Sequence, residues 1–353
     1  MIAEKLHARR ERPRNRRRPI PRRKLAWLPT LRNGAQLAFA LFLLYSGWRF
    51  QQFVAHFESG GATPYVQRPA SVEAFLPLSA LVALKSWLGT GIFDTVHPAG
   101  LVLFLTIVGI SALYKKGFCS WICPIGALSE GLARLGKLVL GRNLAMPGLL
   151  DWPLRGIKYL LLWFFVDAIL LGMNSREAFL FQHGPYNKIA DVKMLHFFTS
   201  PGPEVVAFLV ALGLLSVLFS NFWCRYLCPY GALLGLASLL SPWKVARNPD
   251  RCTNCGLCAR ACPNRIHVDQ ASRIYSPECS GCLDCIAACP RRGALGLALP
   301  HQKPQLSPWL FPAMLLGSFF AAVAWARLSG HWETTISYQE YARLIPEAWR
   351  FSH

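Results

Sequence analysis

Charged residues are scarce in this sequence, and acidic ones especially so. Only 16% of its 353 residues are Asp, Glu, Lys or Arg, against about 25% in an ordinary soluble domain. Hydrophobic residues make up 53% of the chain. This composition excludes a disordered chain and argues against a purely soluble globule. The 38 basic and 18 acidic residues still give a formal net charge of +20, which indicates a membrane protein with basic polar segments.

Several enzyme signatures are missing as well. The sequence contains no Gly-rich dinucleotide fingerprint after a predicted strand and no nucleophile elbow. It also contains no Cys-x-x-Cys-His motif of the kind that attaches c-type haem. We therefore predict no catalytic residues for chemistry on a soluble substrate.

Five apolar stretches are long enough to cross a membrane, which takes about 20 residues. A sixth stretch, 74–93, contains Lys85 near its middle and is predicted to be a short re-entrant or interfacial helix. The five predicted spans are residues 34–54, 98–114, 157–173, 205–222 and 308–326.

The basic residues predict how these spans are oriented. Residues 1–33 hold 12 basic and 2 acidic residues, 115–158 hold 7 and 2, and 221–307 hold 10 and 4. The positive-inside rule places these three segments in the cytoplasm of a bacterial inner-membrane protein, with the C-terminus in the periplasm. The basic N-terminus has no interleaved aromatic residues, so we predict that it orients the chain and that the protein binds no nucleic acid.

Eight of the 12 cysteines form two copies of one motif. Residues 252–263 read CTNCGLCARACP and residues 279–290 read CSGCLDCIAACP. Both are the bacterial ferredoxin run, in which the fourth cysteine of each run binds the other cluster. Zinc sites usually show separated Cys-x2-Cys pairs instead, and a cytoplasmic location disfavours disulfides. The sequence predicts two [4Fe–4S] clusters, one held by Cys252, Cys255, Cys258 and Cys289 and one by Cys279, Cys282, Cys285 and Cys262.

The other four cysteines belong to an internal repeat. Residues 118–127 read FCSWICPIGA and residues 223–232 read WCRYLCPYGA, each directly after a predicted span. Positions i and i+4 share one face of a helix, so each pair is expected to project together. Three interpretations stay open: a third iron–sulfur or other metal centre, redox-active thiols, or reduced structural thiols at a helix boundary. The cysteines concerned are Cys119, Cys123, Cys224 and Cys228.

The predicted fold is mainly α. It is a polytopic membrane protein of about five transmembrane helices plus a re-entrant or interfacial helix, with an inserted small α+β bacterial 2×[4Fe–4S] ferredoxin domain. The predicted parts are a basic cytoplasmic tail (1–33), a membrane domain (34–240), the ferredoxin domain (241–306), a last transmembrane helix (307–326) and a periplasmic tail (327–353).

These motifs resemble a known family. Paired Cys-x3-Cys-Pro motifs at span ends, two ferredoxin runs and a final span are similar to the NapH/MauN ferredoxin-type membrane proteins and to the C-terminal membrane half of NosR. The segments VEAFLPLSALVALKSWL (72–88) and HPAGL (97–101) look closer to NosR-type proteins. The chain shows neither a flavin-binding domain of the NosR kind nor the immunoglobulin-like domain of the CcoG/FixG proteins, so no specific respiratory role is transferred. The resemblance implies membrane electron transfer.

A few polar residues near the predicted spans are candidates for quinone or proton chemistry. They are Asp167, His97 and His183, because ionisable groups at membrane depth are costly and often functional. Pairing near the interface for Asp167 and helix capping for His97 are the alternatives. We predict an electron-transfer subunit between quinone, or a cytoplasmic donor, and a periplasmic redox partner. The alternative is a membrane reductase that supplies electrons for metal-centre assembly, such as a copper site.

Overall fold

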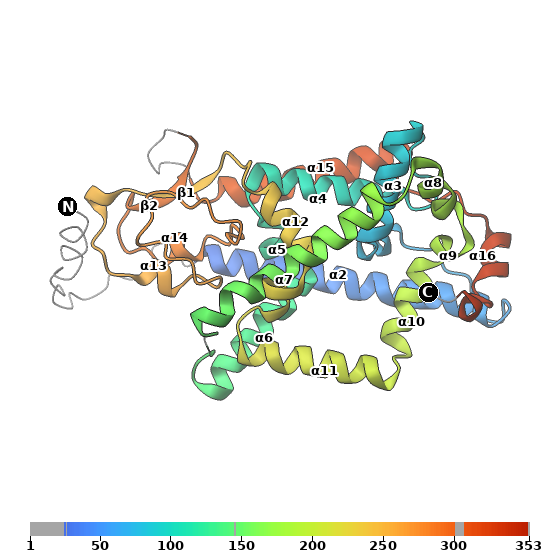
Figure 1. The fold of residues 1–353 in the computed structure, drawn as a ribbon, viewed down its shortest axis with the longest axis horizontal. Coiled ribbons are helices and arrows are strands. Elements are labelled where there is room, and N and C mark those ends of the chain that lie inside the picture. Colours follow the sequence, from blue (N-terminus) through green and yellow to red (C-terminus); the bar gives the residue numbers. More distant parts are fainter. Residues whose placement is uncertain (1–24, 26, 145, 301–306, 352–353) are drawn as a thin grey trace.

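A computed structural model describes residues 25, 27–144, 146–300 and 307–351, and it is mainly helical, as predicted. Long helices follow the long axis of the molecule (Figure 1). A two-stranded sheet and the ferredoxin loops lie at one end, while α8, α9 and α16 lie at the other. The long helices are α2 (Trp27–Glu58), α4 (Pro98–Tyr114), α7 (Gly148–Val166), α11 (Pro203–Leu218) and α15 (Leu310–Leu328).

The other elements connect these helices. The remaining helices are α3 (Pro77–Thr90), α5 (Gly117–Trp121), α6 (Pro124–Leu140), α8 (Ser175–His183), α9 (Pro185–Lys188), α10 (Ala190–Thr199), α12 (Pro229–Ala237), α13 (Leu257–Arg260), α14 (Asp284–Ala287) and α16 (Tyr338–Leu344). The strands are β1 (Lys244–Arg247) and β2 (Leu295–Ala298).

The structure supports fewer spans than the five predicted. Among the described residues, one helix is long and apolar enough to cross a membrane unaided, α15, which matches the predicted span 308–326. Two bent pairs would raise the number to three: α7 with its extension to Leu171 and α8, bent by 100°, and α10 with α11, bent by 76°. The apolar helix α4 has 17 residues. The predicted spans at 34–54 and 98–114 therefore stay predictions.

The predicted re-entrant stretch forms the 14-residue helix α3. Its Lys85 Nζ donates a hydrogen bond of 2.8 Å to the carbonyl oxygen of Leu170. Leu170 lies in a π-helical turn, Asp167–Leu171, that continues α7. A π turn displaces the regular i→i−4 hydrogen bonds, so the lysine satisfies a carbonyl group there.

The C-terminal segment folds back on the molecule. Helix α16 packs against the far end of α2, where the rings of Phe53 and Tyr341 meet edge to face at 5.2 Å. Phe57, Val72 and Ile345 are buried in the same apolar cluster. The end of the chain thereby fixes the loop that follows α2.

The ferredoxin region is built around β1 and β2, which pair antiparallel with Lys244 opposite Ala298. Each cysteine run crosses a tight turn in which equivalent residues take left-handed backbone angles. These are Asn254 (φ 52°) and Gly256 (φ 69°) in the first run, and Gly281 (φ 64°) and Leu283 (φ 62°) in the second. Left-handed angles are costly for residues other than glycine. The two runs therefore share one local fold.

Candidate metal centres

Cysteines of the two ferredoxin runs interact with one another across the runs, and the crossed ligand assignment stays a prediction. Cys289 interacts electrostatically with Cys252 and Cys255 of the other run. Cys262 of the first run does so with Cys279 and Cys282 of the second run. Each group then offers four thiols, three from one run and one from the other, which is the donor set of a [4Fe–4S] cluster.

Backbone N–H groups point at these sulfurs. The amide of Asn254 donates to Cys252 Sγ at 3.5 Å, and the amide of Ile266 donates to Cys262 Sγ at 3.4 Å. Such hydrogen bonds stabilise negative charge on cluster sulfurs. The cysteine positions and the surrounding amides thus fit iron–sulfur clusters.

The two ferredoxin sites differ in exposure. Cys255 is exposed, whereas Cys285 is buried. Burial and neighbouring sulfurs hold the pKa of Cys285 and of Cys282 well above the ordinary thiol value of 9.0. A thiol with such a raised pKa must release its proton to bind iron. The one exposed cysteine among the proposed ligands, Cys255, thus belongs to the first site, and the one buried cysteine, Cys285, to the second.

The four remaining cysteines lie at helix boundaries, and the expected continuous helix through each pair is wrong. Helix α5 carries Cys119 and ends at Trp121, and Cys123 is the extended residue (ψ 121°) that caps α6. In the second copy a π turn, Trp223–Leu227, carries Cys224, and Cys228 caps α12 with ψ 105°. Helical backbone angles are disfavoured for a residue that precedes a proline, and the second cysteine of each motif precedes one.

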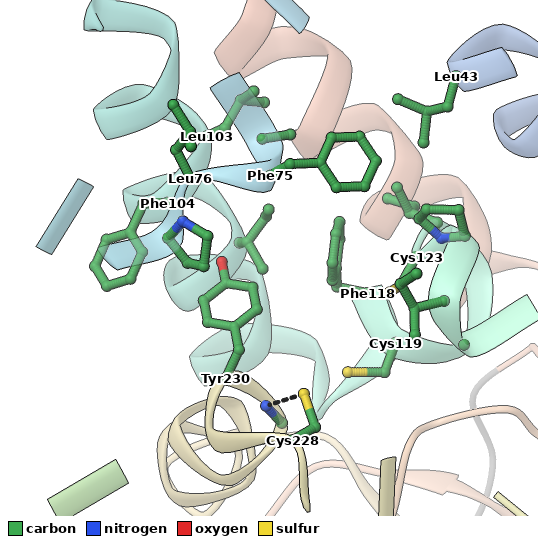
Figure 2. A pocket seen from close by; sticks show the side chains of 18 of the residues that line it. Leu43, Phe75, Leu76, Leu103, Phe104, Phe118, Cys119, Cys123, Cys228 and Tyr230 are labelled. Atoms are coloured by element: carbon green, nitrogen blue, oxygen red, sulfur yellow. Dashed lines mark hydrogen bonds between the residues drawn. The ribbon is translucent and has the colours of Figure 1, made fainter. Parts of the chain in front are cut away.

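The two pairs nevertheless converge. Cys119 interacts electrostatically with Cys123 and Cys228, and Cys224 with Cys228 and Cys119. Figure 2 shows the sulfurs of Cys119 and Cys228 directed toward the same space. Burial raises the pKa of Cys119, Cys123 and Cys224 to about 12 each.

Local contacts hold these thiols in place. The amide of Gly231 donates to Cys228 Sγ at 3.2 Å. A Cβ atom at Gly126, the equivalent position of the first copy, would lie 2.1 Å from the carbonyl oxygen of Cys119. Glycine at this position thus permits the close approach of α6 to α5.

Within the described residues, no three His, Cys, Asp or Glu side chains come close enough to bind one metal ion. A [4Fe–4S] cluster needs more widely spaced ligands than a single metal ion, because each thiolate binds a separate iron atom. Four thiols grouped around one space, with backbone amides beside them, fit that demand.

The second ferredoxin site packs directly on this four-cysteine group. Ser120 Oγ donates to the carbonyl oxygen of Ser280 at 2.7 Å, and Trp121 Nε1 donates to that of Gly281 at 3.1 Å. Arg32 of α2 forms ion pairs with Asp284 at 3.0 Å and Glu130 at 2.5 Å. These contacts join the Cys279–Cys282 turn to α5 and α6. Each of these contacts joins residues that are distant in the chain, so no local sequence pattern predicts them.

Two buried lysines and one glutamate lie at the same junction. Lys158 Nζ is 2.5 Å from Glu278 Oε1, and Lys116 Nζ is 4.0 Å from Glu278 Oε2. Burial alone would raise the pKa of Glu278, but the two lysines outweigh burial and hold this pKa below its ordinary value. Lys116 lies three residues before Cys119 and Glu278 directly precedes Cys279, which is the only sequence signal for either.

A large cleft of about 2080 Å³ begins at the four-cysteine group. Apolar side chains dominate its lining, including Phe75, Leu103 and Phe118 (Figure 2). Cys119, Cys123, Cys224 and Cys228 line one part of it, while Arg68 and Asn187 line another. Its size and apolar lining suit a hydrophobic ligand.

Beside this cleft lies a buried ionic cluster, which we define as Arg68, Glu73, His97 and Asp191. Arg68 pairs with Glu73 at 2.8 Å and with Asp191 at 2.7 Å. His97 Nδ1 is 3.5 Å from Glu73 Oε1, and its Nε2 donates to the carbonyl oxygen of Asn187 at 2.7 Å. The cluster connects the start of α4 with α10.

The ionic cluster predicts a pH dependence of stability. Burial alone would lower the pKa of His97, but Glu73 and Asp191 outweigh burial and raise it above 6.5. Protonated His97 therefore stabilises the fold below pH 6.5. This stability is lost as the pH rises through the raised pKa. We expect the thermal stability of the wild type in detergent to fall over that range, and that of His97→Gln to fall less. Equal pH profiles for the two proteins would contradict this role.

The three residues predicted for quinone or proton chemistry lie apart from one another. His97 belongs to the ionic cluster, whereas His183 Nδ1 donates to the carbonyl oxygen of Phe179 at 2.9 Å, and its ring lies against the ring of Phe179. Asp167 lies in the π turn, half-buried. No hydrogen bond or ion pair joins any two of them within the described residues, and none lines the cleft.

Family models match the two kinds of cysteine motif separately. A model described as a 4Fe-4S binding domain matches residues 96–143 and 201–248, each copy containing one Cys-x3-Cys-Pro motif. A model described as a 4Fe-4S dicluster domain matches residues 244–290, which contain both ferredoxin runs. No solved structure matches the chain.

Curated proteins match either nearly the whole chain or about half of it. YccM of Escherichia coli (strain K12), named as a proposed electron transport protein, is 40% identical over 94% of this chain and 95% of its own length. Protein NirI of Paracoccus denitrificans is 34% identical over 51% of this chain and 26% of NirI. The regulatory protein NosR of Pseudomonas aeruginosa is 30% identical over 52% of this chain and 25% of NosR. Ferredoxin-type proteins MauN and NapH also match.

Proposed function

This chain belongs to the NapH/MauN/NosR-type family of 4Fe-4S ferredoxin proteins, and from that premise we propose that it relays electrons across three iron–sulfur centres between a quinone and a redox partner. Iron–sulfur electron transfer is shared with its relatives. The number of centres, the quinone and the direction of flow are our proposals.

The observation that carries the proposal is the position of the four repeat cysteines. They lie between the second ferredoxin site and the cleft, and they contribute to the lining of the cleft. Four half-buried thiols in one place need a reason, because packing alone does not require two copies of one motif. A third [4Fe–4S] cluster held by Cys119, Cys123, Cys224 and Cys228 supplies that reason.

Each proposed centre has a defined set of ligands and a defined position. The first, held by Cys252, Cys255, Cys258 and Cys289, is open to solvent and is the proposed contact for a soluble partner. The second, held by Cys279, Cys282, Cys285 and Cys262, touches α5 through Ser280 and Gly281. When bound, a [4Fe–4S] cluster gains or loses one electron. The protein's part is to hold the three sets of thiols in sequence and to keep water from the inner two.

The cleft is the proposed quinone site. Its apolar lining suits an isoprenoid chain, and its polar residues Arg68 and Asn187 can donate hydrogen bonds to a carbonyl group. We also propose five spans with the ferredoxin region in the cytoplasm. The excess of basic residues in 115–158 and 221–307 supports that orientation.

Counting iron tests the proposal. We expect about 12 iron atoms and as many sulfides per chain after anaerobic purification, because three [4Fe–4S] clusters need them. A reduced sample should give three distinct paramagnetic signals, and a quinol should reduce at least one. A count near 8 with two signals would reject the third centre and leave a two-cluster ferredoxin. Reduction of Cu(II) without any response to quinol would favour a role in metal-centre assembly.

A further inference from the structure

Among the described residues, the four-cysteine group is flanked by more positive than negative charge. Lys116 is 6% exposed and Lys158 is 0% exposed. Both face Glu278, which supplies one negative charge for two positive ones. Arg155 also acts on Glu278 but is itself paired with Asp151. Burying an unpaired ammonium group is expensive, so the surplus positive charge calls for a negative partner.

The groups that face Lys116 identify this partner. Besides Glu278, Lys158 and Tyr159, the titratable groups acting on it include Cys119, Cys224 and Cys228. Its Nζ also donates to the carbonyl oxygen of Gly231 at 3.3 Å, in the turn that follows Cys228. Lys158 acts on Cys119 and Cys228 as well. Both lysines therefore act electrostatically on cysteines of the proposed third centre.

We propose that Lys116 and Lys158, oriented by Glu278, set the reduction potential of the centre held by the four repeat cysteines. This inference rests on the proposed function, since it needs a cluster at that position. Four thiolates and a cluster carry net negative charge, which increases by one when an electron arrives from the neighbouring ferredoxin cluster or from a hydroquinone. Fixed positive charges stabilise that reduced state, so the lysines raise the potential.

Glu278 gives the arrangement a second property. It lies next to Cys279, a proposed ligand of the second ferredoxin cluster, while its carboxylate contacts lysines that face the third centre. The residue thus belongs to the ligand loop of the second cluster, while its carboxylate orients the lysines beside the third centre. Removing its charge should raise the potential of the third centre, the opposite of removing a lysine. Opposite signs from neighbouring side chains distinguish an electrostatic role from a structural one.

The test is a redox titration of the purified full-length protein, followed by electron paramagnetic resonance. In Lys116→Met we expect the equilibrium for reducing the third centre to become about tenfold less favourable, which is a fall of 59 mV for one electron. Lys116→Arg keeps the positive charge, so the reduction potential of the third centre in this variant should lie close to the wild-type value. In Glu278→Gln this potential should be higher than in the wild type. If the Lys116→Met protein does not accumulate in cells, Lys158→Met is the second test, and it should also lower the reduction potential of the third centre.

Lys115→Met is the matched control. Lys115 is adjacent in sequence and equally buried, at 1% exposed, but its Nζ donates to the carbonyl oxygen of Ile274 and it faces Cys279. It should leave the third centre unshifted. An unchanged potential in both lysine variants, with about 12 iron atoms retained, overturns this inference alone. A wild-type count near 8 overturns the proposed function itself.

Discussion

Replacing Cys224 and Cys228 together by alanine is expected to lower the iron content from about 12 to about 8 atoms per chain. Both thiols belong to the group that lines the inner end of the cleft. The variant should keep the signals of both ferredoxin clusters but lose their reduction by quinol, since the connection between cleft and ferredoxin region would be gone. Iron analysis and stopped-flow reduction with a quinol measure the two effects.

The substitution Cys255→Ala is expected to have the opposite effect on the cluster signals and on the response to quinol. Cys255 is exposed and lies in the first ferredoxin run. Its loss should remove the outer signal while the third centre still responds to quinol. If the Cys224/Cys228 variant keeps all its iron, the four repeat cysteines are not cluster ligands. If it loses iron but still reacts with quinol at the wild-type rate, the cleft is not the entry point.

Arg68→Leu is expected to destabilise the protein by about 3–5 kcal/mol, the usual cost of breaking a buried ion pair. The substitution leaves the carboxylates of Glu73 and Asp191 buried without their cation. Both carboxylates are almost wholly inaccessible, so water cannot compensate. Thermal unfolding in detergent, followed by circular dichroism, measures the loss.

A matched substitution at the surface gives the baseline. Arg350 pairs with Glu347 at 3.1 Å, but both side chains are about half exposed, and such pairs contribute about 0–1 kcal/mol. Arg350→Leu should therefore barely change the unfolding temperature. Similar losses in the two variants would show that the ionic cluster near α4 contributes no more than a surface pair.

The ferredoxin region was predictable because its information is local. Cysteine spacing within a run of 12 residues, and the proline that follows, predict a ferredoxin domain, and a 4Fe-4S dicluster model matches these residues. For the two Cys-x3-Cys pairs the sequence left three interpretations open, a shared metal centre among them. The helix expected through each pair was wrong, because Pro124 and Pro229 force the preceding cysteine into an extended conformation.

The sequence alone did not predict the long-range contacts. Arg68 and Asp191 are 123 positions apart, and Lys158 and Glu278 are 120 apart. Nothing in a single sequence relates such positions. The bends between α7 and α8, and between α10 and α11, were missed for a related reason. Hydropathy measures how apolar a stretch is but carries no information about its direction.

The hydrogen bond between Trp121 and Gly281 has a consequence for the rate of electron transfer. Many electron carriers hold a cluster on a mobile arm, and their turnover waits for the arm to swing. Here the Cys279–Cys282 turn is hydrogen-bonded to the same short helix that carries Cys119. The inner two groups of cysteines therefore keep one separation. An electron passing between them would meet a constant tunnelling distance, and its rate would not depend on the viscosity of the surrounding solvent.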